Sequence, residues 1–464
     1  MSINKLFENK LNVVNIGLSS FKEALDNAGA KSVQVDWRPP LDIDPDLLKK
    51  LKAKLPAIEE ANKEAIDRIL RGHPFLVGLA KAIEVIPNMH ENLILHAGPP
   101  ITWDRMCGPV RGAIVAALIY EGKAKTKEEA EALAGSGKIK FAPCHEHQTV
   151  GPMAGIVSAS MPVFMIKNAT FGNLAFCTMN EGLGKVLRFG AFGPEVIERL
   201  KWMEKTLYPA LKKAIAVVEK IDLKNIIAQA LHMGDEVHNR NRAATSLLYR
   251  MLAPLIVKTC DDKDVAIKVL EFISGNDHFF LNLSMPAAKS VLDSARNIEN
   301  SSLVVAMCRN GVEFGIQVAG TKNQWFTGPA SIVDALFFPG FTKEDANPDL
   351  GDSAITEPYG LGGTAIAAAP AIVQFIGGNV SDAMNYTKLM YEITVTESNA
   401  YQIPYLNFRG TPTGIDIIKI IEKNILPVID TGVAHKDAGV GQIGAGLVRP
   451  PVEPFKKAFT ALVS

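Results

Sequence analysis

The densest group of titratable side chains follows a short apolar run near residue 140. The segment Pro143-Cys-His-Glu-His147 precedes Gly151-Pro-Met-Ala-Gly155 and places His145, Glu146 and His147 side by side. These residue types are suited to general acid–base catalysis, because histidine titrates near neutral pH. They could instead bind a metal ion or only make hydrogen bonds within the loop. The spacing matches no standard zinc pattern such as CxxC or HExxH, so we predict no metal and no cofactor.

Two loops in the C-terminal third combine glycine with acidic or basic groups. Gly351–Glu357 contains Asp352 and precedes Gly360-Leu-Gly-Gly363, which we expect to lead into a helix. The loop His435–Gly446 formally contains a dinucleotide-binding spacing of glycines, but the prolines that follow cannot start the helix this motif requires. A backbone cradle for a ligand remains as an interpretation. We therefore predict catalytic roles for Asp352 and His435, and substrate-binding roles for Lys436, Gly439, Gly441 and Gln442.

Arginines accompany several polar loops and could hold an anionic ligand. A guanidinium offers two parallel donors to a carboxylate or a phosphate, and a nearby helix start adds backbone N–H groups. The alternative in each case is a solvated surface arginine. The arginines predicted to bind the substrate are Arg105 in the loop His96–Pro109, Arg240 and Arg242 at a predicted helix start, and Arg409 just before another predicted helix. The polar residues Asn276 and Thr411 are predicted to bind the substrate with them.

The elements that must position these loops predict a mixed α+β fold, with two α/β portions separated by an inserted all-α domain. Residues 1–193 begin with a strand–helix–strand pattern typical of a parallel βαβ unit and include the His/Cys loops. Residues 194–298 carry apolar side chains at helical spacings and predict a helical domain with its own core. Residues 299–464 form the second portion, with a hairpin turn at Asn310-Gly311.

Local signals also predict where several helices begin. Asp44 followed by Pro45 is typical of a helix start, and Pro56 is expected to open a further helix. Thr126 and Glu129 form a capping-box pattern. Helices are also expected over residues 364–375, 381–395 and 415–423.

Composition excludes several classes of protein. The 464 residues are 47% hydrophobic and 21% charged, with a formal net charge of zero, so neither nucleic acid nor an anionic membrane is an expected partner. No signal peptide is recognisable, and the stretch Gly362–Gly378 is shorter than the roughly 20 apolar residues of a spanning helix. The five scattered cysteines show no CxxC spacing. These features predict a cytoplasmic protein in a reducing compartment.

Taken together, the loops resemble the AllG (YlbE/YahG) family, long described as a domain of unknown function. The resemblance covers almost the whole chain and is carried by HAGPPITWDRMCGP, PCHEHQTVGPMAG, NRNRAA, NDHFFLNLSM, GDSAITEPYGLGG, FRGTPTGID and TGVAHKDAGVGQIGAG. It implies a subunit of a bacterial oxamate carbamoyltransferase, working with two other subunit types, one of which resembles acyl-CoA synthetases. That complex would interconvert oxalurate plus phosphate with oxamate plus carbamoyl phosphate in purine-ureide (allantoin) catabolism.

The resemblance leaves alternatives open. The chain could be a non-catalytic scaffold of such a complex, or an amidohydrolase of unknown substrate, and it could also form a homo-oligomer. Under the leading hypothesis it binds a small anionic substrate and transfers a carbamoyl group. We expect the loops that start at His96, Cys144, Gly351, Arg409 and His435 to gather around one cleft.

Overall fold

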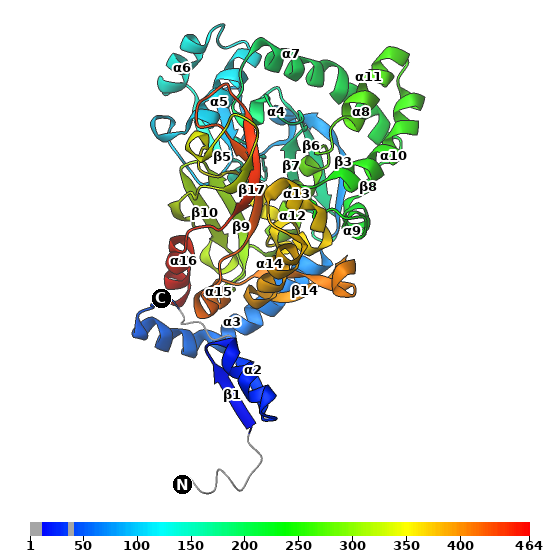
Figure 1. Ribbon diagram of the computed structural model, residues 1–464. Coiled ribbons are helices and arrows are strands. Elements are labelled where there is room, and N and C mark those ends of the chain that lie inside the picture. The colour runs from blue at the N-terminus through cyan, green and yellow to red at the C-terminus, as the bar shows by residue number, and fades with distance from the viewer. Residues whose placement is uncertain (1–11, 36–40) are drawn as a thin grey trace, which may run out of the picture.

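The computed structural model describes residues 12–35 and 41–464 and shows a mixed α+β protein. Strand β1 (Asn12–Ile16), helix α2 (Ser19–Asn27) and strand β2 (Lys31–Val35) form the predicted βαβ unit, in which the two strands pair in parallel. This unit projects from the rest of the molecule in Figure 1.

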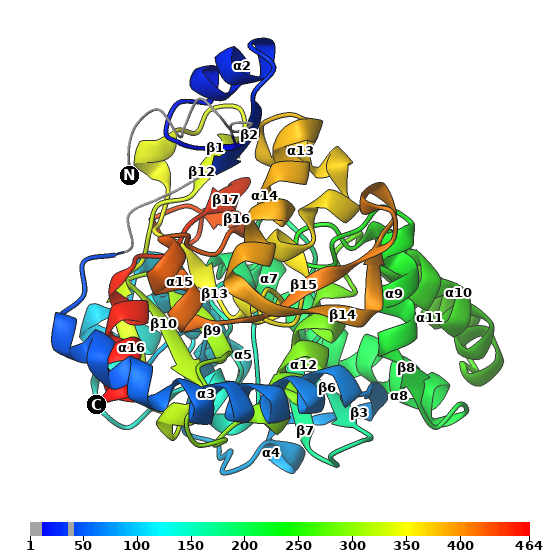
Figure 2. The same ribbon diagram turned by 90° about the horizontal axis from the view of Figure 1, so that it is seen from below.

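The long helix α3 (Pro45–Arg71) follows and lies across the body of the protein (Figure 2). Its predicted start is confirmed, because the Asp44 side chain accepts a hydrogen bond from the Asp46 backbone N–H at 2.9 Å. The expectation that Pro56 opens a separate helix is wrong. Pro56 lies inside the continuous helix on its exposed side, where water can bind the carbonyl group that the proline ring leaves without an N–H donor.

Short sheets and helices make up the remainder of the N-terminal portion. Strand β3 pairs with β6, and β6 with β7, in an antiparallel sheet, whereas β4 and β5 pair in parallel. The predicted cap at Thr126 is confirmed, since its hydroxyl accepts from the Glu129 N–H at 3.2 Å. The elements are β3 (Pro74–Lys81), α4 (Ala82–Val85), β4 (Leu93–His96), η1 (Trp103–Arg105), α5 (Gly108–Tyr120), α6 (Lys127–Gly135), β5 (Lys140–Pro143), η2 (Cys144–His147), β6 (Pro162–Asn168), β7 (Leu174–Thr178) and η3 (Leu187–Phe189).

The middle segment is almost entirely helical. Its elements are α7 (Pro194–Trp202), the π-helical turn η4 (Met203–Leu207), α8 (Tyr208–Ala216), β8 (Ile221–Asp222), α9 (Leu223–His232), α10 (Arg242–Thr259), α11 (Lys263–Ser274), α12 (Leu281–Leu292) and η5 (Asp293–Ala295). The two-residue strand β8 joins the sheet of β3. The core of this segment is not its own, because Leu248 and Val269 belong to one apolar cluster with Leu76, Phe164 and Ile355 from the flanking portions.

The C-terminal portion contains most of the remaining strands. The predicted hairpin is confirmed, since β9 and β10 pair antiparallel around Gly311. The elements are β9 (Val304–Asn310), β10 (Glu313–Val318), η6 (Ala319–Thr321), β11 (Phe326–Pro329), β12 (Asp334–Phe337), η7 (Lys343–Asp345), β13 (Leu350–Gly351), η8 (Ser353–Thr356), η9 (Gly362–Thr364), η10 (Ile366–Ala368), η11 (Pro370–Ile372), α13 (Val373–Ile376), α14 (Val380–Ile393), β14 (Thr394–Ile403), η12 (Pro404–Leu406), β15 (Arg409–Ile415), α15 (Ile417–Lys423), β16 (Ile429–Ala434), β17 (Gln442–Val448) and α16 (Glu453–Val463).

One predicted helix of this portion is absent from the described structure. Residues 364–375 form short 3₁₀ turns that end in α13, and not the expected helix. The backbone here packs against neighbouring backbone, and a Cβ atom at Gly363 would lie 1.9 Å from the Val428 carbonyl oxygen. Tertiary contact therefore overrides the helical preference of the alanines. The helices predicted over 381–395 and 415–423 are confirmed as α14 and α15, with boundaries shifted by up to two residues.

A second apolar cluster joins the two ends of the chain. Leu51 and Ile58 of α3 pack with Phe455 and Phe459 of α16, and the two helices lie together in both views (Figures 1 and 2). In the described part of the chain, no helix combines the length and the apolar character that crossing a membrane would require.

Glycines let the predicted loops pack backbone to backbone. A Cβ atom at Gly98 would lie 2.4 Å from the Asn310 backbone nitrogen, and one at Gly108 would lie 2.1 Å from the Lys436 carbonyl oxygen. Gly155, with φ +63°, approaches Ala97 in the same way. The glycines therefore bring these loops together, and mainly by close packing.

Candidate functional site

Asp352 ties two of the predicted loops together. It follows β13 and is fully buried. Its Oδ1 accepts from the Gly98 N–H at 2.8 Å, and its Oδ2 accepts from the Gly151 N–H at 3.0 Å. The Asp352 N–H donates back to the Gly151 carbonyl at 2.9 Å. Both carboxylate oxygens are thus used to hold the loops on which His96 and His145 lie.

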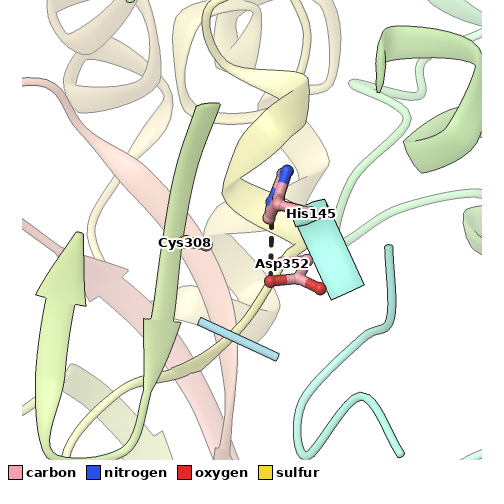
Figure 3. A group of neighbouring side chains, drawn as sticks. All are labelled: His145, Cys308 and Asp352. Atoms are coloured by element: carbon pink, nitrogen blue, oxygen red, sulfur yellow. Dashed lines mark ion pairs between the residues drawn. The ribbon is translucent and has the colours of Figure 1, made fainter. Parts of the chain in front are cut away.

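His145 lies next to this carboxylate. Its Nε2 is 3.5 Å from Asp352 Oδ1, and Figure 3 shows the two side chains facing each other beside Cys308 of β9. Neither ring nitrogen of His145 has a hydrogen-bond partner within residues 12–35 and 41–464. The imidazole is therefore a buried donor and acceptor that is free to bind something else.

The surroundings keep His145 neutral. Burial holds its pKa well below the ordinary value, and the positive charges of Lys289 and Arg296 lower it further. Burial raises the pKa of Asp352 to about 7, although the N–H groups of Gly98 and Gly151 oppose that shift. A neutral imidazole at neutral pH can accept a proton from a reacting group.

A polar pocket of about 560 Å³ opens in front of His145. We call it the His145 pocket; it is lined by Arg68, His145, Glu146, Gln148, Asn173, Leu174, Asp293, Ser294, Arg296, Asn297, Gln317 and Asn323. The described elements η2, α3 and η5 all contribute to its wall. Its volume suits a small polar ligand.

Two cations share one carboxylate next to the His145 pocket. The Asp293 carboxylate accepts two hydrogen bonds from the buried Lys289 Nζ, at 2.9 and 2.7 Å, and also pairs with Arg296. Arg296 Nη1 donates to Gln317 and Asn323. Its Nη2 is buried and without a hydrogen-bond partner in the described part of the chain. One carboxylate between two cations leaves a site suited to an anion.

A second polar region lies at the meeting point of all three portions of the chain. We call it the Arg188 cavity; it is lined by Pro152, Met153, Leu183, Arg188, Phe189, His238, Asn239, His278, Leu281, Ser353, Thr431, Gly432 and Gln442. Its volume of about 20 Å³ is enough for roughly one water molecule. Burial lowers the pKa of Arg188 to about 10, so the guanidinium is still charged at neutral pH. Arg188 Nε and Nη1 have no hydrogen-bond partner among the described residues.

Behind this cavity lies a buried group of acidic residues around one imidazole. His238 Nδ1 is 2.8 Å from Glu357 Oε1 and 3.3 Å from Asp430 Oδ1. The Glu236 carboxyl is also buried near Asp430. Burial raises the pKa of Asp430 to about 7, and the negative charge of Glu357 raises it further. We call these four residues the His238 cluster.

The two buried groups differ as metal ligands. His145, Cys308 and Asp352 place one ligand atom each within 4.8 Å of one another, and so do His238, Glu357 and Asp430. In the first group both oxygens of Asp352 already accept N–H bonds, and burial raises the pKa of Cys308 well above its ordinary value, which keeps the thiol protonated. The first group is therefore poorly suited to a metal.

The other predicted acid–base residues lie outside these two regions or at their edge. Glu146 is exposed at the rim of the His145 pocket, where it accepts from Trp325 Nε1 at 3.0 Å. His147 turns away, with Nδ1 2.8 Å from the Pro87 carbonyl oxygen. His435 packs edge-on against Phe341, and Lys436 donates to the Glu344 carbonyl at the surface. His435 lines neither of the two regions, and one cleft shared by all five loops stays a prediction.

The predicted arginines also point elsewhere. Arg105 is exposed and lies 3.5 Å from Glu313, and Arg242 is exposed near Asp277. Arg240 donates to the Gly234 carbonyl at 2.9 Å. Arg409 pairs with Glu397 at 2.8 Å and stacks on Tyr391, half exposed. Arg409 lies at the start of β15 rather than just before a helix, so the helix N–H groups we expected beside it are not there.

The remaining predicted ligand-binding residues pack within the fold, and among them only the buried Thr411 hydroxyl lacks a hydrogen-bond partner in the described chain. Asn276 donates to the Asn180 backbone and side chain, both at 3.2 Å. Thr411 is buried against the backbone of Gly360. Gly439 donates its N–H to the Gly190 carbonyl. Gly441 and Gln442 contact the loop that carries Arg188, through Gly184, and Gln442 also lines the Arg188 cavity.

Several charged residues that the structure places inside were not predicted from the sequence. Lys289, Asp293 and Arg296 are spaced by four and three residues, a spacing that puts side chains on one helix face and that was available as a signal. Arg188 lies in Val186-Leu-Arg-Phe189 between several glycines, so a lone charge in an apolar stretch was the signal there. No motif singled out Asp430, which lies in β16.

Comparison with known proteins identifies relatives of this chain. The family model described as oxamate carbamoyltransferase subunit AllG matches residues 139–353. The chain is 47% identical to an uncharacterised Escherichia coli protein, YahG, over 98% of this chain and 97% of that protein. It is 45% identical to the E. coli oxamate carbamoyltransferase subunit AllG, over 88% and 98%. A crystal structure of a conserved Enterococcus faecalis protein of unknown function superposes with a TM-score of 0.86 at 52% identity, covering 88% and 98%.

Proposed function

The chain belongs to the family of the oxamate carbamoyltransferase subunit AllG, as its resemblance indicated, and from this premise we propose that it works as one subunit of a carbamoyl-transfer enzyme. The reaction is the interconversion of oxalurate plus phosphate with oxamate plus carbamoyl phosphate. The subunit acts together with other subunits, one of them resembling an acyl-CoA synthetase, in allantoin catabolism. The observation that carries the proposal is the buried, neutral His145 imidazole, which has no hydrogen-bond partner in the described chain and belongs to the wall of a polar pocket that also holds Arg296.

The chemistry needs an anion site and a proton carrier at the same place. Oxamate has a carboxylate next to its amide, and Arg296 Nη2 with the surplus charge of Lys289 supplies a partner for that carboxylate. When the amide nitrogen attacks the carbonyl carbon of carbamoyl phosphate, the C–O bond to phosphate breaks and the nitrogen loses a proton. His145 accepts this proton and returns it in the reverse direction.

The test is an assay of the complex reconstituted from purified subunits, with the chain alone in parallel. We expect oxamate-dependent consumption of carbamoyl phosphate by the complex. Arg296→Gln should weaken oxamate binding by roughly 2–5 kcal/mol, and Arg296→Lys by less, because the charge is kept and the fork is lost. Arg250→Gln, which changes an exposed arginine of α10, is the matched control.

Two outcomes would contradict the proposal. If the complex is active and both Arg296 variants have the KM and kcat of the parent, the pocket does not bind the substrate. If activity requires this chain and is also unchanged by substitution of His145, the chain acts as a scaffold and the transfer occurs on another subunit.

A further inference from the structure

The His238 cluster gathers ligand atoms from distant parts of the chain. His238 lies just before α10, Glu357 follows η8, and Asp430 lies in β16. One ligand atom from each residue lies within 4.8 Å of the others, and all three side chains are almost completely buried. Because these groups are buried, hydration by solvent cannot offset the cost of holding them close together.

No lysine or arginine of the described chain forms an ion pair with the carboxyl groups of the cluster, and burial raises the pKa of Glu236 well above its ordinary value. Glu236, Glu357 and Asp430 are three carboxyl groups around one imidazole. The nearby Arg309 uses its guanidinium on Asp349, at 2.5 and 3.0 Å, on Thr431 and on the Gly351 carbonyl. A buried carboxylate needs a cation or N–H donors to offset its lost hydration.

Asp430 is the clearest sign of a missing ligand. Both of its oxygens are buried and accept no N–H group in the hydrogen bonds of the described chain, and its hydrogen-bonding neighbour is the Glu236 carboxyl, whose pKa burial raises well above its ordinary value. Glu357 is different, because Oε1 accepts from the Gly363 N–H at 3.1 Å and Oε2 from the Thr356 hydroxyl at 3.1 Å. Gly363 and Thr356 thus fix Glu357, whereas Asp430 is held only by another carboxyl group.

The spacing of the ligand atoms matches a coordination shell. Bonds of about 2.1 Å to a divalent metal place neighbouring ligands roughly 3.0–3.4 Å apart in octahedral or tetrahedral geometry. The contacts of His238 Nδ1 with Glu357 and Asp430, at 2.8 and 3.3 Å, are close to this range. The loop closes tightly over the group, since a Cβ atom at Gly362 would lie 2.5 Å from Glu357 Oε1 and 2.8 Å from His238 Nδ1.

We propose that His238, Glu357 and Asp430, with Glu236 as a fourth ligand, form a binding site for a divalent metal ion. One imidazole with several carboxylates is a ligand set suited to Mn²⁺. His238 also lines the Arg188 cavity, so a water molecule or an anion on the metal would face Nε and Nη1 of Arg188, which have no hydrogen-bond partner among the described residues. The site is separate from the His145 pocket and does not depend on the proposed carbamoyl transfer.

The test measures Mn²⁺ itself and requires no enzyme activity. The full chain is produced in medium containing Mn²⁺, because the buried site is filled most easily while the chain folds. Metal content is measured after removal of loosely bound ions, and Mn²⁺ affinity is measured by electron paramagnetic resonance on chelator-treated, reloaded protein. We expect one Mn²⁺ per chain and a thermal unfolding transition raised by the metal.

Asp430→Asn is the informative variant, since the amide keeps the size of the side chain and can still form a hydrogen bond with the Glu236 carboxyl, so the fold should be kept. It should weaken Mn²⁺ binding by roughly 100-fold and abolish the thermal shift. His145→Gln, in the other buried group, should leave Mn²⁺ binding unchanged.

Three results would overturn the proposal. The first is that none of Mn²⁺, Zn²⁺ and Mg²⁺ binds. In that case protons shared between the carboxyl groups, and not a metal ion, hold the cluster together. The second is equal binding by the parent and Asp430→Asn. The third is loss of binding in His145→Gln alone, which would place the metal in the His145 group.

Discussion

Asp352, which follows β13, and Asp430, which lies in β16, are both buried aspartates, and burial raises the pKa of each to about 7. Their surroundings nevertheless differ. Asp352 accepts two backbone N–H bonds and holds two loops, whereas Asp430 accepts no N–H from another loop of the described structure and lies against the Glu236 carboxyl. Burial and titration alone therefore do not reveal the role of a carboxylate. The hydrogen-bond partners separate a structural clamp from a candidate ligand.

The same difference separates the two regions. Beside Asp352, His145 belongs to the wall of a polar pocket of about 560 Å³, next to two cations that share the Asp293 carboxylate, which suits an anionic substrate. Around Asp430, three carboxyl groups and one imidazole lie in a closed space without a lysine or arginine ion pair in the described chain, which suits a cation. The local set of charged groups, rather than a single residue type, assigns the two regions different ligands.

The largest effect that would test this division is on catalysis. We expect His145→Gln to lower kcat of the reconstituted complex by roughly 10²–10⁴-fold, because it removes the neutral proton acceptor from the pocket. His90→Gln, at an exposed histidine, serves as the control. If His145→Gln keeps full activity, the assignment of the chemistry to this pocket is wrong.

The next largest effect is on stability, where substitution of the two aspartates should have different costs. Asp352→Asn replaces one accepting oxygen with an amide that cannot accept the Gly98 or Gly151 N–H, so it should lower the free energy of unfolding by about 2–3 kcal/mol. Asp430→Asn in metal-free protein should change it by less than about 1 kcal/mol. Urea unfolding of both variants measures this, and equal losses would remove the distinction between clamp and ligand.

The pH dependence of stability gives a smaller effect. The folded pKa of Asp352, about 7, lies above its ordinary value of 3.8, so the folded protein holds an extra proton between these pH values. The stabilisation from this group is complete below pH 3.8 and is lost as the pH rises toward 7. Asp352→Asn should flatten that decline by up to roughly 1.4 kcal/mol per pH unit, measured by urea unfolding at several pH values. An unchanged slope would mean that Asp352 titrates normally.

The surface arginines should show the smallest effects. Arg409→Lys keeps an exposed charge beside Glu397, and Arg105→Lys keeps one beside Glu313. Each should change stability by less than about 1 kcal/mol and leave KM for oxamate unchanged. A raised KM in steady-state kinetics of either variant would show that a surface arginine, and not Arg296, binds the substrate.

Local sequence patterns were sufficient for many elements of this protein. The Asn310-Gly311 hairpin, the caps at Asp44 and Thr126 and the helices of the middle segment follow from turn chemistry and apolar spacing, which act over a few residues. Residue type was also enough to select His145 and Asp352 as candidates. The motif segments indicated the family, which the comparisons confirm.

Only the tertiary structure decided which charges are inside. The Gly98 N–H that Asp352 accepts is 254 positions away in sequence, and His238, Glu357 and Asp430 of the His238 cluster come from three separate segments. Arg409 and Arg296 are both arginines, but their surroundings differ. Arg409 is half exposed and pairs with Glu397, whereas Arg296 lines the same pocket as His145 and has a buried Nη2 without a hydrogen-bond partner in the described chain. Burial and long-range contacts set these differences, and no local pattern encodes them, because the partners meet only when the chain has folded.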